Sequence, residues 1–397
     1  MPWKETCAVS ERNRLVELVV DDSVSVAEAS RLVGVSRKSA YKWLSRFREG
    51  GRDALDDRSR ARLTQEHATC DAVKGLLIEL RRMTGDGPRQ LLWLAHRKYP
   101  KLALPSVSTV SAILKSANLI EPSRRRRRDA ELHGPVGPYR PGVLANDQWT
   151  VDFKGQFRLG DGSLCYPLTV QDDATRFVLC VEGYGSTSEA PVLLSFRRLF
   201  AKYGVPQRIH SDNGWPFAST GLMRMSRLSV EWMLQDVKVC RSRPGHPQDN
   251  PRHERMHRTL KKKTARPPAE TARGQQIRFG RFKHWIDYER GHEGIGMRAP
   301  GELYVPSPRE YVARPKPFDY PGHWEVRSVR SNGECKLSGG MVFLSECLKG
   351  ERVGLEEIDD DLWRVCFRRT ILALVDMRGK SPRVLPPGWS KKEGKED

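Results

Sequence analysis

The sequence lacks any apolar run of about 18 or more residues, the length that a membrane-spanning helix needs. It also lacks a basic amphipathic helix with a broad aromatic face, which would indicate binding at a membrane surface. The opening segment MPWKETCAVSERNR has no apolar core of the kind found in secretory signal peptides. These absences predict a cytoplasmic protein with no membrane partner.

Paired cysteines are missing as well. The eight Cys residues are scattered, with no CxxC pair and no matched spacing. A disulfide framework or a zinc cluster would need such pairing, so we expect reduced thiols. The N-terminal region also lacks a His/Cys pattern with the spacing of a zinc site.

Acidic residues are scarce relative to basic ones. The 397 residues include 69 Lys and Arg against 49 Asp and Glu, a formal net charge of +20. This excess predicts a polyanionic partner, and without membrane signals the favoured polyanion is double-stranded DNA. The length allows two to four domains. The hydrophobic share of 38% is too high for a disordered chain.

Residues 1–60 have the pattern of a helix-turn-helix domain. Ser25 begins one helix, Gly34 marks the turn, and Ser36 can cap a second helix over 37–48. The second helix is basic, as expected for one that enters the major groove. An ordinary helical hairpin with a solvated basic face is the alternative. The predicted DNA-contacting residues of this helix are Arg37, Lys38, Tyr41, Lys42 and Arg46.

A second helical, winged-helix-like DNA-binding unit is predicted over 65–122, with helices at 70–83, 87–100 and 105–120. An Arg-rich linker follows over 123–144. Its five consecutive basic residues are predicted to lie along DNA phosphates and to supply salt-dependent affinity. They are Arg124, Arg125, Arg126, Arg127 and Arg128.

The chain changes character at residue 145. Residues 145–312 alternate strand and helix patterns after a β-meander, which predicts a multidomain α/β protein with an α/β catalytic core. Residues 316–380 contain short alternating strands and turn signals that fit a small SH3-like β-barrel. The segment 381–397 is predicted to be a disordered tail.

Three acids stand in distinctive places. Asp152 lies within a strand in WTVDFKG, Asp212 follows a strand in RIHSDNGWPF, and Glu254 begins a strongly basic helix. Any one acid among 49 is uninformative, and Asp-Asn-Gly at 212–214 is also a turn signal. The set is informative because carboxylates without imidazole or thiolate ligands favour Mg²⁺ or Mn²⁺.

These segments resemble the DDE transposase and retroviral integrase superfamily, which has a ribonuclease-H-like fold. The similarity is carried by WTVDFKG, DDATRF, HSDNGWPF, RSRPGHPQDNPRHERMHRTLKK and FKHWIDYERGHEGIGMRAPGELYVPSPREY. The insertion-sequence groups IS-three and IS-four-eighty-one look most similar, over residues 1 to about 375. The resemblance implies an integrase-type core flanked by N-terminal helix-turn-helix domains and a C-terminal barrel.

The resemblance also implies a function. Asp152, Asp212 and Glu254 would be the catalytic triad and would hold two Mg²⁺ or Mn²⁺ ions. The enzyme would bind terminal inverted repeats, cleave the ends hydrolytically, and join the 3′-hydroxyl to target DNA by transesterification. Arg258 and Lys261, at i+4 and i+7 from Glu254, would grip DNA. A homo-oligomer on paired DNA ends and a nucleoid-associated location are implied.

The chain departs from the family pattern at Glu231, at Gln235-Asp236, at Pro251 and at Gly291. Pro251 fixes the backbone three residues before Glu254. Two alternatives therefore stay open. One is a catalytically impaired or domesticated DNA-binding protein or regulator. The other is a ribonuclease-H-type nuclease unconnected with transposition.

Overall fold

The computed structural model describes residues 7–57, 69–120, 141–219, 221, 223–242, 250–338, 340–379 and 381–387. The chain divides into two compact units, Met1–Cys70 and Asp71–Asp397. All eight cysteines lie in the described residues, and none of them takes part in a disulfide. Among the described residues, none of the helices combines the length and the apolar character that crossing a bilayer requires.

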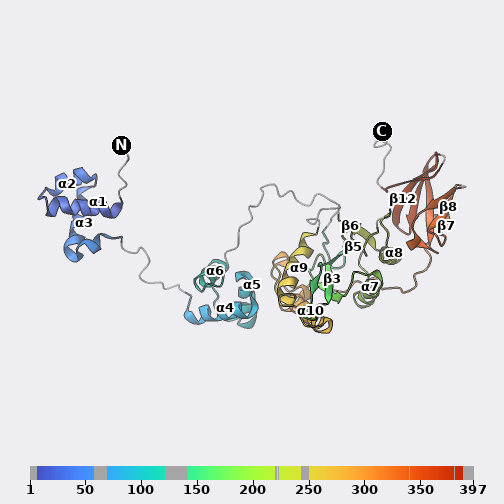
Figure 1. The fold of residues 1–397 in the computed structure, drawn as a ribbon, viewed down its shortest axis with the longest axis horizontal. Coiled ribbons are helices and arrows are strands. Elements are labelled where there is room, and N and C mark those ends of the chain that lie inside the picture. The colour runs from blue at the N-terminus through green and yellow to red at the C-terminus, as the bar shows by residue number, and fades with distance from the viewer. Residues whose placement is uncertain are drawn as a thin grey trace. The chain divides into compact units, whose positions relative to one another are not determined.

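The first unit is a small helical bundle, blue in Figure 1, of α1 (Ala8–Val20), α2 (Val26–Val33), α3 (Arg37–Gly50) and a 3₁₀ turn (Arg52–Leu55). Ser25 and Ser36 cap α2 and α3, each accepting a backbone N–H three residues on. Gly34 ends α2 with a φ of 76°, which glycine adopts without steric cost. The bundle encloses Leu15, Ala29, Ala40 and Leu44.

The second unit opens with three more helices, α4 (Asp71–Thr84), α5 (Pro88–Lys98) and α6 (Val107–Ser116). Their core consists of aliphatic side chains at helical spacing, including Leu77, Leu80, Leu91, Val110 and Leu114. Ser106 caps α6 by accepting the N–H of Thr109.

A mixed sheet forms the centre of the second unit. Its strands are β1 (Gln148–Phe153), β2 (Phe157–Arg158), β3 (Leu164–Asp172), β4 (Val178–Tyr184), β5 (Arg208–Ser211) and β6 (Lys238–Arg241). β3 pairs with β1, β2 and β4, and the order continues β1-β5-β6. β1, β3 and β4 are antiparallel neighbours, whereas β5 and β6 run parallel to β1. This is the ribonuclease-H-like topology.

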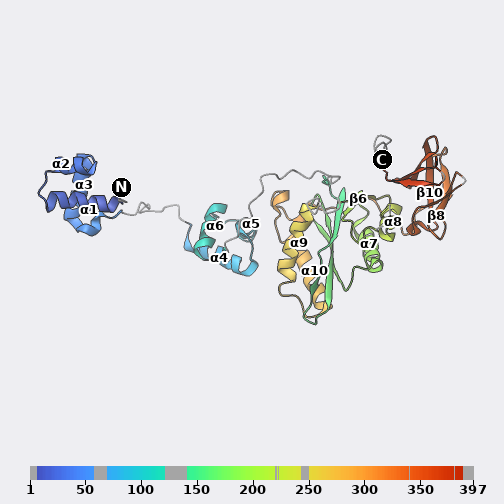
Figure 2. The ribbon, with the colours of Figure 1, turned by 45° about the horizontal axis from the view of Figure 1, so that its top comes forward.

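Helices cover both faces of this sheet, as Figure 2 shows. α7 (Glu189–Tyr203) and α8 (Arg227–Leu234) pack Phe196, Phe200 and Trp232 against Trp149 and Val151 of β1. α9 (Pro251–Thr264) and α10 (Ala272–Tyr288) pack on the other face, where Met256, Leu260 and Phe279 join residues of β3 and β4. The two faces of β1 therefore meet different helices.

The C-terminal β domain contains β7 (Glu325–Ser328), β8 (Glu334–Leu337), β9 (Gly340–Phe343), β10 (Arg352–Asp359), β11 (Leu362–Phe367), β12 (Thr370–Asp376) and β13 (Arg383–Leu385). Five strands form the order β13-β12-β11-β10-β7, and β8 pairs with β9. The prediction of a disordered tail from residue 381 is wrong for 383–385. There β13 pairs with β12, because Leu385 is buried against Leu362 and Leu374.

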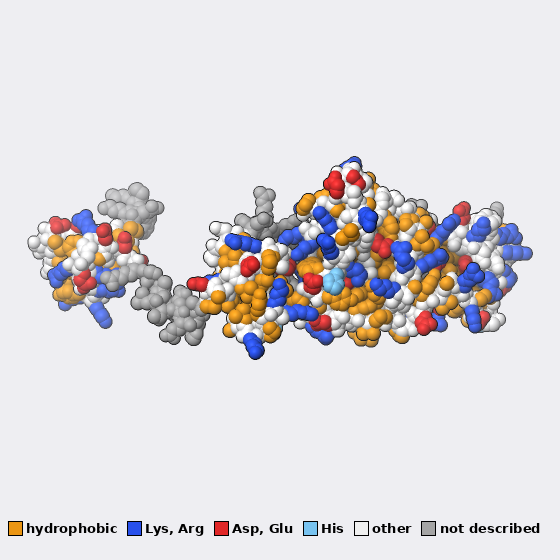
Figure 3. Space-filling view, turned by 90° about the horizontal axis from the view of Figure 1, so that it is seen from below, with side chains coloured by type: hydrophobic (Ala, Val, Ile, Leu, Met, Phe, Trp, Pro, Cys, Tyr) orange, Lys and Arg blue, Asp and Glu red, His pale blue; other side chains and the backbone are white. Residues whose placement is uncertain are grey.

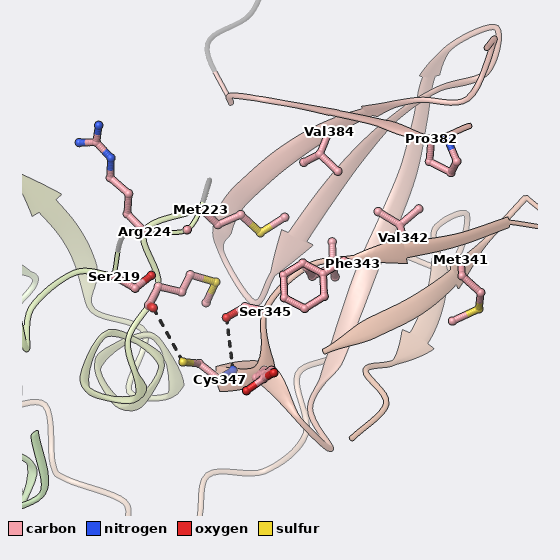
Figure 4. A pocket seen from close by; sticks show the side chains of 14 residues that line it. Ser219, Met223, Arg224, Met341, Val342, Phe343, Ser345, Cys347, Pro382 and Val384 are labelled. Carbon is pink, nitrogen blue, oxygen red and sulfur yellow. Dashed lines mark hydrogen bonds between the residues drawn. The ribbon is translucent and has the colours of Figure 1, made fainter. Parts of the chain in front are cut away.

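The β domain packs on the segment that leads into α8. Met225, Val230 and Met233 share an apolar cluster with side chains of the β domain. Cys347 Sγ donates to the carbonyl oxygen of Met225 at 3.8 Å. Figure 4 shows the cavity of about 500 Å³ that remains at this contact, with Met223 and Phe343 pointing into it. Its lining contains none of the three predicted catalytic acids.

Candidate active site

Asp152 is the fifth residue of β1, close to the carboxyl end of the strand. Trp149 and Val151 are fully buried on the α7 side. Since side chains alternate along a strand, Thr150 and Asp152 face the α9 side. The Asp152 side chain is 30% exposed, which leaves one edge of the carboxylate open to solvent.

Asp212 directly follows β5, the parallel neighbour of β1. The paired register runs Gln148 to Arg208 and Thr150 to His210. Continuing this register by two residues along both strands brings Asp152 opposite Asp212. The Asp212 carboxylate also accepts the N–H of Gly214 at 3.1 Å. The Asp-Asn-Gly segment is therefore a turn, and the turn holds a carboxylate at the sheet edge.

Glu254 lies in the first turn of α9 and is exposed. Pro251 is the first residue of that helix, a position where proline's missing N–H costs no intrahelical bond. The neighbours His253, Met256 and His257 are buried toward the sheet. Helix periodicity thus directs Glu254 away from the packed face of α9.

The three carboxylates share one electrostatic environment. The pKa of Asp152 is raised to about 7, first by burial, next by the negative charge of Asp212, and to a smaller extent by Glu254. The N–H of Phe153 and the charge of Lys154 oppose this rise. Burial also raises the pKa of Asp212. The pair tends to hold a proton unless a cation offsets its charge.

No group of three or more His, Cys, Asp or Glu side chains within the described ranges is gathered tightly enough to hold a metal ion as it stands. The carboxylates nevertheless repel one another, as the pKa of Asp152 shows. An all-oxygen donor set with excess negative charge suits Mg²⁺ or Mn²⁺. The residues therefore fit such an ion chemically.

Two buried histidines of α9 attach this helix to the sheet. His253 Nδ1 lies 2.8 Å from the hydroxyl of Thr150 on β1. Both His253 Nε2 and His257 Nε2 lie 2.6 Å from the hydroxyl of Thr169 on β3. The same hydroxyl is 3.0 Å from the carbonyl oxygen of Asp152. The network joins the backbone at Asp152 to the helix that carries Glu254.

Sequence reasoning missed these histidines, although the signal was present. Residues 253–257 read His-Glu-Arg-Met-His, the H-E-x-x-H spacing of zinc-protease helices. Here both imidazoles are buried against hydroxyls of the sheet while Glu254 is exposed. Burial lowers the pKa of His253 to about 3 and that of His257 well below its usual range. The spacing therefore serves to position α9.

The predicted DNA-contacting residues that the structure describes lie on two helices. Arg37, Lys38, Tyr41 and Lys42 are exposed on α3, and Arg46 is half-buried, with its guanidinium 4.8 Å from the ring of Trp43. On α9, Arg258 and Lys261 are exposed. The predicted run Arg124 to Arg128 lies outside the described residues. Figure 3 shows Lys and Arg side chains spread over the visible face of the second unit.

Comparison with known proteins agrees with this architecture. Residues 11–62 match the family described as helix-turn-helix domain. Residues 143–247 and 235–300 match two families, each described as integrase core domain. The first of these segments contains Asp152 and Asp212, and the second contains Glu254. This part of the chain is similar to integrase core domains, in agreement with the ribonuclease-H-like topology of its sheet.

Individual relatives are distant. The chain is 29% identical over 131 residues to the Gag-Pol polyprotein of avian reticuloendotheliosis virus, a match that covers 33% of this chain and only 11% of that protein. A simian T-cell lymphotropic virus intasome, solved with a PP2A regulatory subunit, matches 74% of this chain and 97% of its own at 15% identity, with a TM-score of 0.37.

Two integrase catalytic cores are also similar. That of HTLV-2, solved with magnesium, covers 41% of this chain and 99% of its own at 14% identity, with a TM-score of 0.32. That of BIV covers 40% of this chain and 94% of its own at 21% identity, with a TM-score of 0.31. At such scores these similarities add nothing to what the strand order already shows.

Proposed function

We propose that this protein is a DNA transposase of the insertion-sequence type, similar to the IS-four-eighty-one group, with Asp152, Asp212 and Glu254 as its catalytic triad. The observation that carries the proposal is the register of β1 and β5. It brings Asp152 opposite Asp212 beside the helix of Glu254, within the two integrase-core matches.

Different residues of the site have different roles in this proposal. Asp152, Asp212 and Glu254 would hold two Mg²⁺ or Mn²⁺ ions, and Thr169 with the two histidines would keep α9 beside β1. When bound, such ions activate water and stabilise charge on the scissile phosphate. The carboxylates would not bind the DNA directly. The basic residues of α3 and α9 would contact the DNA and position it for the reaction.

The proposed reaction has two steps. Hydrolysis frees a 3′-hydroxyl at each transposon end, and transesterification then joins that hydroxyl to a target phosphodiester. Because two ends must be processed together, the active form would be a homo-oligomer on paired ends. The α3 helix would read the terminal repeats through the major groove.

A nicking assay tests the proposal. A supercoiled plasmid carrying the genomic flanks of the gene is incubated with the full chain and Mg²⁺ or Mn²⁺. We expect nicking by the wild type and none by Asp152→Asn or Glu254→Gln, both of which should still bind the plasmid. Asp161→Asn, an exposed acid on the loop before β3, is the matched control and should nick normally.

Each alternative has its own outcome. Wild-type protein that binds the flanks and never nicks them would be a DNA-binding regulator. Nicking without any joining of ends to a second plasmid would indicate a nuclease unconnected with transposition.

A further inference from the structure

A second charged cavity lies beside α9, apart from the three carboxylates. It has a volume of about 430 Å³. Its charged lining comes from α9, from the turn between β3 and β4, and from the segment after α10. The cationic residues among its lining are Arg176, Arg252, Arg255, Arg258 and Arg290.

The interior of this cavity is short of negative charge. Asp173 offsets two of the guanidiniums, through contacts of 3.3 Å to Arg176 and 3.0 Å to Arg252. The one acid in the lining, Glu293, is already paired with Arg89 of α5 at 2.9 Å. Within the described residues Arg255, Arg258 and Arg290 make no ion pair within 4 Å, although the charges of Asp86 and Glu293 act on Arg290 from further away.

Two residues that line the cavity each have a polar side-chain atom that is buried without a hydrogen-bond partner in the described part of the chain. These atoms are Nε of Arg290 and Nδ1 of His292. Buried N–H groups are normally satisfied, so an orphaned guanidinium nitrogen in a basic cavity indicates an acceptor that is supplied from outside. Burial, and next the positive charges of Arg176, Arg290 and Arg255, lower the pKa of His292 to about 4.

We propose that this cavity binds one backbone phosphate of the substrate DNA, through Arg255 and Arg290, at a point separate from the metal-binding carboxylates. A phosphate accepts several charge-assisted hydrogen bonds at once, and guanidinium is the group that matches it best. Arg255 is the residue after Glu254 on α9, so a strand anchored here would run close to the proposed triad. This inference rests on the proposed function for the identity of the DNA.

The position of α5 supports a bound DNA strand that contacts both α5 and the core of the second unit. Gln90 of α5 lines the cavity and donates to the carbonyl oxygen of Gly291 at 2.6 Å. A phosphate held between Arg255 and Arg290 would thus sit where α5 meets the core. Both helices would then contribute to the same DNA contact.

Salt dependence of DNA binding tests this site without any need for catalysis. The full chain is titrated with a double-stranded oligonucleotide in EDTA between about 50 and 200 mM salt. Each phosphate contact contributes about 0.9 to the slope of log K against log salt. We expect Arg255→Gln and Arg290→Gln each to lower the slope by about 1. Arg273→Gln, an exposed arginine of α10, is the matched control and should leave the slope within error.

Further variants and probes keep the outcome clear. Arg290→Lys keeps the charge and should recover part of the slope, which a folding defect would not allow. Equal slopes in the wild type, Arg255→Gln and Arg273→Gln would overturn the proposal. Tight binding of inorganic pyrophosphate that is lost in Arg255→Gln, together with a DNA slope that is unchanged in Arg255→Gln, would also overturn the proposal. The ligand would then be a free phosphate. If the wild type does not nick the plasmid but its slope still exceeds those of Arg255→Gln and Arg290→Gln, the transposase function is refuted and the phosphate site is retained.

Discussion

Binding of Mg²⁺ to the DNA-free protein should release protons from Asp152. Burial and the charge of Asp212 raise the pKa of Asp152 to about 7, so at pH 7 about half of the molecules carry a proton there. A divalent ion binds the ionised carboxylate, and the proton must leave. The expected release is about 0.9 proton at pH 6, about 0.5 at pH 7 and about 0.1 at pH 8.

A neighbouring imidazole and the second carboxyl of the pair bear on this proton count. His257 Nδ1 lies 3.6 Å from Asp152 Oδ2, and burial lowers the pKa of His257 well below its usual range, which favours the neutral imidazole. The Asp212 carboxyl is coupled to Asp152 and can carry the shared proton instead. The proton count therefore belongs to the pair.

Isothermal titration calorimetry in buffers of different ionisation enthalpy measures the proton count directly. The wild type is compared with Asp152→Asn and with the control Asp161→Asn, whose exposed carboxyl should already be ionised at these pH values. We expect Asp161→Asn to match the wild type and Asp152→Asn to release almost nothing. Release that is independent of pH from 6 to 8, or that survives in Asp152→Asn, would refute the electrostatic coupling of the carboxylates.

Other expectations follow from the same contacts. Asp152→Asn should stabilise the metal-free protein at pH 8 and not at pH 4, because a pKa raised from 3.8 to about 7 makes the folded state lose stability as pH rises through that window. The full effect would be ~4 kcal/mol at about 1.36 kcal/mol per pKa unit, and partial exposure reduces it to ~1–2 kcal/mol in urea titrations. Thr169→Val should slow plasmid nicking at least ~10-fold by releasing both histidines, while Thr169→Ser keeps the rate, as a nicking time course would show. Arg368→Met should make the linker before β7 more sensitive to limited proteolysis, because it removes two 2.9 Å bonds to Asp236 worth ~1–3 kcal/mol. Gly291→Ala should loosen α5 from the core by ~1–3 kcal/mol, measured by hydrogen exchange in α5.

The sequence predicted most elements of the core because its signals are local. Helix caps at Ser25 and Ser36 were visible as serine before an apolar-periodic run, and the structure confirms both. The strand character around Asp152 and Asp212 followed from short β-branched and apolar runs. What placed these two acids opposite each other was the parallel pairing of β1 with β5, a contact across about 60 residues that no local pattern encodes.

The charged cavity and the histidine network could not be predicted for the same reason. Arg176, Arg255 and Arg290 come from three separated segments, and each alone resembles a solvated surface charge. The H-E-x-x-H spacing was readable, but its meaning depends on which face of α9 meets Thr150 and Thr169. β13 was missed because a three-residue strand beside a charged tail carries too little periodicity.

Three of the residues that depart from the expected family pattern make specific contacts in the structure. Asp236 stands where glycine is common and has a φ of 56°, a left-handed conformation that costs a non-glycine residue ~1 kcal/mol. Its carboxylate gains a bidentate pair with Arg368 of the β domain. Glu231, where tryptophan is usual, likewise pairs with Arg197 of α7 at 2.8 and 3.1 Å.

Gly291 is explained by the same kind of compensation. A Cβ at this position would lie 2.7 Å from the carbonyl oxygen of Met297 and 2.9 Å from the indole of Trp93 on α5. The proline expected from the family would therefore displace α5, whereas glycine lets Trp93 approach and leaves the Gly291 carbonyl free to accept from Gln90. Glu231, Asp236 and Gly291 therefore each take part in a contact between neighbouring elements, and none of these contacts involves Asp152, Asp212 or Glu254.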